Sequence, residues 1–117
     1  GGYLFGAAIN FYDSTVYISP IQQLAELTYD QKTGFLENRA EYSKQFSDFI
    51  ADNYYVLAIS AVFFAHTRKE ITHSYERIMR LYKKTRPEKI KEISLSDFSY
   101  KPIIKATPAA LITKPTK

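Results

Sequence analysis

The hydrophobic pattern is dominated by one long periodic run, the fifty residues from Phe35 to Lys84, which contain neither glycine nor proline. At 100° per residue, its large apolar side chains fall within about 40° of one line, as on one face of a helix. These side chains are Phe35, Tyr42, Phe46, Phe49, Leu57, Phe64, Ile71, Tyr75, Ile78 and Tyr82. A single straight helix would be about 75 Å long, too long for a compact domain of this size. The run therefore predicts two helices that fold back on each other.

The break between these helices is expected at Asp52-Asn53, because Asp caps a following helix and Asn tolerates turn conformations. This break places the helices at about 34–51 and 54–85. The second helix begins with YYVLAISAVFFA, which is apolar on nearly every side and predicts full burial. This apolar segment is shorter than the ~20 residues that cross a bilayer. A core helix is therefore favoured, with a segment in or against lipid at 53–66 as the alternative.

The N-terminal part has a different pattern, with short apolar runs in 3–18 on either side of a polar turn at residues 12–15. It predicts a hairpin or an extended arm, because the β-branched and aromatic residues that dominate it are poor helix formers. Ser19-Pro20 is typical of a helix start, so a short helix is expected over 20–28. A loop should follow at 29–34.

The C-terminal part changes character after Arg86-Pro87, because the residue before proline is pushed out of helical space. Residues 98–117 have three prolines and four lysines but no acidic residue, a composition that favours extended chain. Four aliphatic side chains make this segment too apolar for an inert linker and predict a docking arm. They are Ile103, Ile104, Leu111 and Ile112.

Together these elements predict an all-α fold, a helical bundle made of a short helix and a long antiparallel helical hairpin. Residues 1–97 would form a single helical domain, with 1–18 as an N-terminal arm or β-hairpin. Residues 98–117 would form the extended C-terminal arm.

Composition narrows the chemistry that this fold could carry. The chain of 117 residues has no cysteine, which excludes disulfides, thiolate metal sites and thiol nucleophiles. All four glycines lie within the first 34 residues, so no glycine-rich phosphate loop or serine elbow can follow them. Ten tyrosines and eight phenylalanines supply large contact area, which is typical of interfaces. We therefore expect no catalytic residue and no cofactor, and the compartment stays open.

Charge is divided unevenly along the chain. Residues 1–67 carry three basic and seven acidic groups, whereas residues 68–117 carry thirteen basic and five acidic groups. Halves of opposite sign suit either the association of like subunits or an anionic partner for the second half. Two solvated faces that differ by chance would give the same pattern.

A basic stripe on the second predicted helix is the clearest candidate for anion or nucleic-acid contact. Its members lie opposite the apolar line and continue past the helix end: Lys69, Arg77, Arg80, Lys84, Arg86, Lys89 and Lys91. A phosphate backbone could neutralise such a stripe. The alternative is a solvated face with helical ion pairs, for which Glu76–Arg80 and Lys84–Glu88 have the right spacing.

The spacing of His66, Glu70 and His73 is the only one that resembles a metal site, because helix bundles hold metals with a Glu-x-x-His pair. No second such pair exists in the chain, and the three residues fall opposite the apolar line. We therefore expect these side chains to face water, and we predict no metal site.

The function expected from the sequence is a non-enzymatic structural subunit of a larger protein assembly, a homo- or hetero-oligomer joined through its arms. Apolar arms and a small core leave hydrophobic surface that one copy cannot cover. Two alternatives remain: a helical protein that coats nucleic acid, and a small accessory subunit of a membrane complex.

Overall fold

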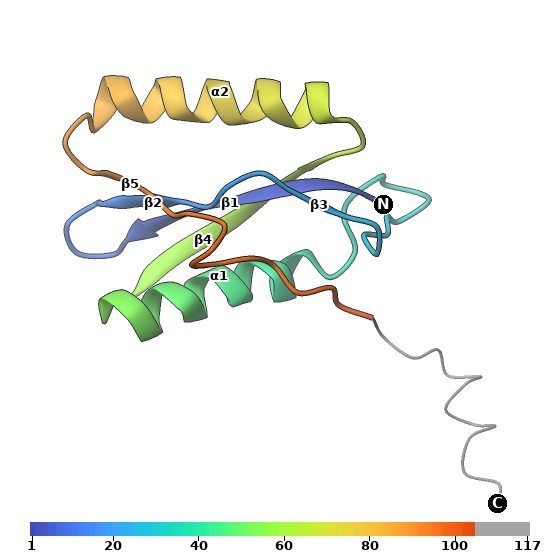
Figure 1. Cartoon of the computed structure of the whole chain (residues 1–117), viewed down its shortest axis with the longest axis horizontal. Helices are drawn as coiled ribbons and strands as arrows, with labels where there is room; N and C mark the ends of the chain where they lie inside the picture. The colour runs from blue at the N-terminus through green and yellow to red at the C-terminus, as the bar shows by residue number, and fades with distance from the viewer. Residues whose placement is uncertain (105–117) are drawn as a thin grey trace, which may run out of the picture.

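Strand β1 (Gly2–Asn10) lies at the centre of a five-stranded mixed sheet. The structure is a computed structural model, and it describes residues 1–104. Helix α1 (Arg39–Tyr54) covers one face of the sheet and helix α2 (Arg68–Thr85) covers the other, which gives three layers (Figure 1). The fold is therefore mixed α/β, and the prediction of an all-α helical bundle is wrong.

Three strands pair directly with β1, all of them antiparallel. On one side β4 (Ala58–Ala65) pairs along almost the whole strand, from Tyr3 opposite Ala65 to Asn10 opposite Ala58. On the other side β2 (Val16–Ile18) and β3 (Gln22–Leu24) share the length of β1. Strand β5 (Ile90–Glu92) then adds parallel to β2.

Alternation along β1 divides the core into two halves. Leu4 and Ala8 belong to the larger cluster under α1, together with Tyr42, Phe46 and Ile50 of that helix. Phe5 and Ala7 belong to the cluster under α2, with Ile71 and Met79. Both faces of β1 are therefore apolar, because helices cover both of them.

Residues 54–65 are the largest error in the sequence prediction, because 58–65 are strand β4 rather than helix. A short continuous apolar run is compatible with a strand as well as with a buried helix, so the run alone does not distinguish them. Ile59, Val62 and Phe63 are β-branched or aromatic residues, which favour a strand. The pairing with β1 decided between two structures that share this pattern.

The predicted helix at 20–28 is also absent, because residues 22–24 form β3 and pair with β1. Leu24 and Leu27, which lie within the predicted helix, are both buried in the cluster under α1. The hairpin alternative for residues 3–18 is present, but β1 is the central strand of the sheet and not an arm that reaches a neighbour.

The two long helices differ from their predicted bounds. Helix α1 begins at Arg39, five residues later than expected, and continues through Asp52 to Tyr54. It ends because Tyr55 adopts a left-handed conformation with φ 58°, and the Tyr55 amide donates to the Ala51 carbonyl oxygen. Helix α2 begins only at Arg68, where the Thr67 side chain accepts a hydrogen bond from the Glu70 amide and caps it.

Candidate assembly surface

The outer edge of β4 is unpaired among residues 1–104, because β1 is its only partner strand there. The Phe11 amide donates to the Leu57 carbonyl oxygen over 2.9 Å, which makes these opposed residues a hydrogen-bonded pair. In an antiparallel ladder such pairs alternate, so odd-numbered β4 residues point their amides and carbonyls toward β1. The even-numbered residues point theirs outward, and they are Ala58, Ser60, Val62 and Phe64.

Nothing in the β4 sequence protects this edge. Natural sheets shield exposed edges with charged side chains, prolines, bulges or very short strands. Strand β4 has eight residues, AISAVFFA, with no charge and no proline, and its pairing with β1 is continuous without a bulge. The strand is therefore a template to which another extended chain could add.

Exposed apolar side chains gather at the start of this edge. Leu57 and Ile59 are 64% and 67% exposed, and Phe11 is 66% exposed. They line a shallow apolar pocket with Ala58. Tyr55 just before them is 88% exposed. Apolar residues clustered on a surface in this way mark contact sites far more often than single exposed ones do.

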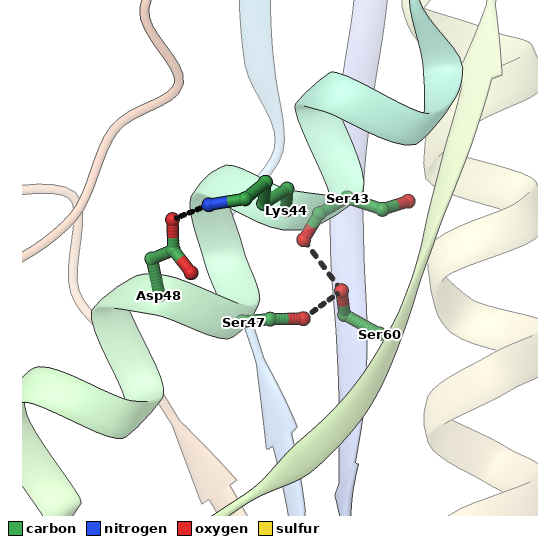
Figure 2. Close-up of polar contacts among 5 residues, drawn as sticks. All are labelled: Ser43, Lys44, Ser47, Asp48 and Ser60. Atoms are coloured by element: carbon green, nitrogen blue, oxygen red, sulfur yellow. Dashed lines mark hydrogen bonds and ion pairs between the residues drawn. The ribbon is translucent and has the colours of Figure 1, made fainter.

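Helix α1 presents small residues along the same edge. Figure 2 shows the Ser43 carbonyl and the Ser47 hydroxyl of α1 pointing toward Ser60 of β4, while Lys44 and Asp48 lie on another side of the helix. The Ser60 hydroxyl donates to the Ser43 carbonyl oxygen over 2.5 Å and accepts from the Ser47 hydroxyl over 2.6 Å, since it has only one proton to give. These bonds fix β4 against α1.

The small residues form a stripe, because Ala40 and Ala51 continue the helical spacing of the two serines. Beyond the stripe, Lys44 and Asp48 form an exposed ion pair at 2.7 Å, and the Asp48 carboxylate raises the pKa of the Lys44 ammonium. An exposed pair of this kind adds little to stability.

The first four residues of the predicted basic stripe lie on the outer face of α2. Its helical members are all exposed: Lys69, Arg77, Arg80 and Lys84. The ion pairs of the alternative interpretation, Glu76–Arg80 and Lys84–Glu88, do not form, since Lys44–Asp48 is the one salt bridge within residues 1–104. Glu76 lines a shallow pocket together with Arg80 on the same stretch of α2. The face is therefore not purely cationic.

The remaining members of the stripe contact the protein itself. The Lys89 ammonium donates to the Asp13 carbonyl oxygen over 2.7 Å. Arg86 lies over the Tyr82 ring at 5.6 Å from its centroid, and Lys91 lies over the Tyr54 ring at 5.2 Å. The structure therefore does not join all seven predicted residues into one unengaged surface.

The predicted docking arm begins inside the core. Phe98 and Tyr100 are buried in the cluster under α1, and burial raises the pKa of the Tyr100 hydroxyl. The side-chain amide of Gln22 bonds both backbone groups of Tyr100, and that of Gln45 bonds both of Lys101.

After these clamps the arm leaves the core. Ile103 is half-buried and its amide donates to the Tyr42 hydroxyl, whereas Ile104 is exposed. Leu111 and Ile112 lie outside the described residues. The docking role of the arm therefore stays a prediction.

The histidine region carries no metal cluster in the described chain, where no group of three or more potential ligands is close enough to hold an ion. His66, Glu70 and His73 are all exposed. His66 lies in the link between β4 and α2, with its ring 4.3 Å from that of Tyr29. The Glu70 amide and carboxylate both contact the Thr67 hydroxyl, as in a helix cap.

Neither described helix is long and apolar enough to cross a membrane.

Sequence reasoning missed the edge of β4 because it assigned these residues to a helix, although the strand length and its β-branched and aromatic residues were visible signals. Comparison with protein-family models, with curated proteins and with solved structures gave no match, so function is inferred from the surfaces of this chain.

Proposed function

We propose that the protein is a non-enzymatic subunit of a protein assembly and that it joins its neighbour through the edge of β4. The observation that carries the proposal is an eight-residue edge strand with no charge, whose outward backbone groups have no partner in residues 1–104. Strand addition would satisfy these groups and cover exposed Leu57 and Ile59.

Chemistry points the same way as the surface. Catalytic sites gather titratable groups with perturbed pKa values in a cleft. The aspartates with lowered pKa values, Asp13 and Asp30, lie in exposed turns and accept bonds from nearby backbone amides. Those pKa shifts have local structural causes, so these two carboxylates do not mark a catalytic site.

The test places a charge on the edge. Ala61→Lys adds a cation to an exposed position of β4 whose backbone already bonds β1, so the fold should be kept. Gln31→Lys in an exposed loop is the matched control, because it adds the same charge away from the edge. Both variants are produced in the source cells, and the native mass of their assemblies is measured.

The proposal expects Ala61→Lys to lose the native assembly while Gln31→Lys keeps it. Circular dichroism and urea unfolding of each purified variant check that the fold is unchanged. An Ala61→Lys protein that is folded and still found in an assembly of unchanged mass would refute the role of the β4 edge.

A second candidate function is contact with a nucleic-acid backbone through α2. It is favoured by the exposed cations Arg77, Arg80 and Lys84, which have no ion-pair partner in the described chain. The affinity for DNA duplex of any sequence should fall as the salt concentration rises. The logarithm of the binding constant should fall with the logarithm of the salt concentration, with a slope of about −0.9 per neutralised phosphate. The pair Arg77→Ala and Arg80→Ala should flatten that slope, while Lys32→Ala, in an exposed loop, should not.

A further inference from the structure

We infer that the neighbour at the β4 edge is a second copy of this chain, paired antiparallel about a two-fold axis through Ala61. The inference rests on the proposed function and specifies its partner. Every copy carries the same unprotected strand, so self-pairing needs no other molecule.

Strand geometry limits the registers that two copies can adopt. In an antiparallel pair, directly opposite residues point their side chains to the same face, so their numbers must have the same parity. Backbone bonds can form only between the outward even-numbered residues of the two copies. A two-fold axis that satisfies both conditions passes through a residue of β4 and not between two residues.

The axis through Ala61 uses the edge most fully. It sets Ser60 opposite Val62 of the second copy and Ala58 opposite Phe64, so every outward residue of β4 finds a partner within the strand. An axis through Val62 would instead leave Ala58 opposite His66, which lies outside the strand. The first register therefore satisfies more backbone groups.

The side chains agree with the same register. On the α2 face, Ile59 of one copy would lie opposite Phe63 of the other, a β-branched–aromatic pair of the kind that stabilises sheets. Ile59 is largely exposed, whereas Phe63 is half-buried and stacks on Phe5 with centroids 4.9 Å apart. The exposed Ile59 near the start of one β4 strand would thus contact Phe63 near the end of the other, where Phe5 supports it.

The small-residue stripe of α1 fits this arrangement on the opposite face. A two-fold axis perpendicular to the sheet places both α1 helices on one face, next to each other and antiparallel. The side of α1 that lies along β4 carries Ala40, Ser43, Ser47 and Ala51, and small side chains allow two helices to approach closely.

Cross-linking tests the axis directly, because the chain has no cysteine of its own. Ala61 of the two copies would form a non-hydrogen-bonded pair with Cα atoms about 4.5 Å apart, within the range of a disulfide. Ile59→Cys is the matched control, since it is on the same face and also exposed. Its two copies would lie about 14 Å apart at 3.4 Å per residue, too far for a disulfide.

The expected result is rapid dimeric disulfide formation by Ala61→Cys and little or none by Ile59→Cys, whose Cα atoms would lie beyond the disulfide distance limit. A charge exchange provides the second readout. Ala61→Lys and Ala61→Glu should each sediment as monomers, because like charges would meet on the axis. Their mixture should recover the dimer, because opposite charges would then meet.

Failure of this inference can be told apart from failure of the proposed function. Equal cross-linking of the two cysteine variants, or a wild-type chain that stays monomeric across a concentration series, would overturn the two-fold pairing. If Ala61→Lys still loses the native assembly in that case, the edge binds a different chain and the proposed function stands. An Ala61→Lys protein that keeps the native assembly overturns the proposed function itself.

Discussion

The sheet edges formed by β5 and by β4 are built differently. Strand β5 has three residues, two of which are Lys91 and Glu92, and Pro87 precedes it closely. Short length, charge and proline are the usual protections of an edge. Strand β4 at the other edge has eight residues and none of these features. The chain therefore protects the edge at β5 and leaves the edge at β4 open.

Their surroundings differ in the same sense. At the β5 edge the long basic side chains fold back onto the protein, with Lys91 over the Tyr54 ring and Lys89 bonded to the hairpin turn. At the β4 edge the large apolar side chains of Leu57 and Ile59 extend into solvent. One edge is satisfied within the chain, whereas the other leaves large apolar side chains exposed.

Proline substitutions within β4 distinguish the amides that point toward β1 from those that point outward. They should give the largest change in the free energy of unfolding. Ala61→Pro removes an amide that points to β1, leaving a buried carbonyl without a partner, at a cost of about 1–3 kcal/mol of unfolding free energy besides backbone strain. Ala58→Pro removes an outward amide at the first residue of the strand, where proline is tolerated. Urea unfolding measures both variants.

We expect Ala58→Pro to stay close to wild type in stability but to weaken self-association in sedimentation equilibrium. Equal destabilisation by the two prolines would show that the amides of β4 do not alternate between the two sides, contrary to the pairing described above.

Opening the protected edge reverses the comparison. Lys91→Val with Glu92→Thr removes the charges of β5 and should add a second adhesive edge to each chain. Light scattering across a concentration series should then show species larger than those of the wild type. The control is Lys32→Val with Glu37→Thr, which removes the same charges from exposed loop positions. If that control aggregates equally, net charge and not the edge is responsible.

The serine contacts between β4 and α1 should give a smaller effect. Ser60→Ala removes the hydroxyl that bonds the Ser43 carbonyl and accepts from Ser47, and each bond contributes about 0.5–1.5 kcal/mol net. Thermal or urea unfolding should show a loss of about that size. Ser96→Ala, at an exposed position whose hydroxyl contacts only Ser94, is the control. A loss no larger than that of the control would mean that these bonds do not hold β4 in place.

The apolar periodicity predicted the buried face correctly for α1 and α2, each of which packs on the sheet with one of its sides. The apolar line through Ile71, Tyr75, Ile78 and Tyr82 is the face of α2 that packs on the sheet, and the cations opposite it are exposed. The same reasoning located Tyr42 and Phe46 on the buried face of α1. In both helices the apolar residues recur at the spacing that places them on the buried face, and polar residues occupy the exposed face.

Periodicity could not identify β4, because its sequence is apolar on both faces and so has no polar side to set a period. The open edge was further out of reach. It depends on which strands pair with β1, and the partners of β1 come from residues up to about sixty positions apart. The candidate surface is therefore a property of topology, whereas the exposed cations of α2 could be predicted from sequence alone.

The last and smallest effect concerns the turn that borders the protected edge. The Asp13 carboxylate accepts a hydrogen bond from the Thr15 amide over 2.9 Å, which lowers the pKa of Asp13 below 3.8, and the nearby Lys89 ammonium lowers it further. A group with a lowered folded-state pKa stabilises the fold above its unfolded pKa and loses that contribution as the pH falls through the folded value. The hairpin between β1 and β2 should therefore weaken below about pH 4. Asp13→Asn should flatten the dependence of urea stability on pH between 5 and 2, and circular dichroism of the variant at pH 7 checks that its fold is unchanged. An Asp13→Asn curve parallel to wild type would show that the turn does not support this edge through its charge.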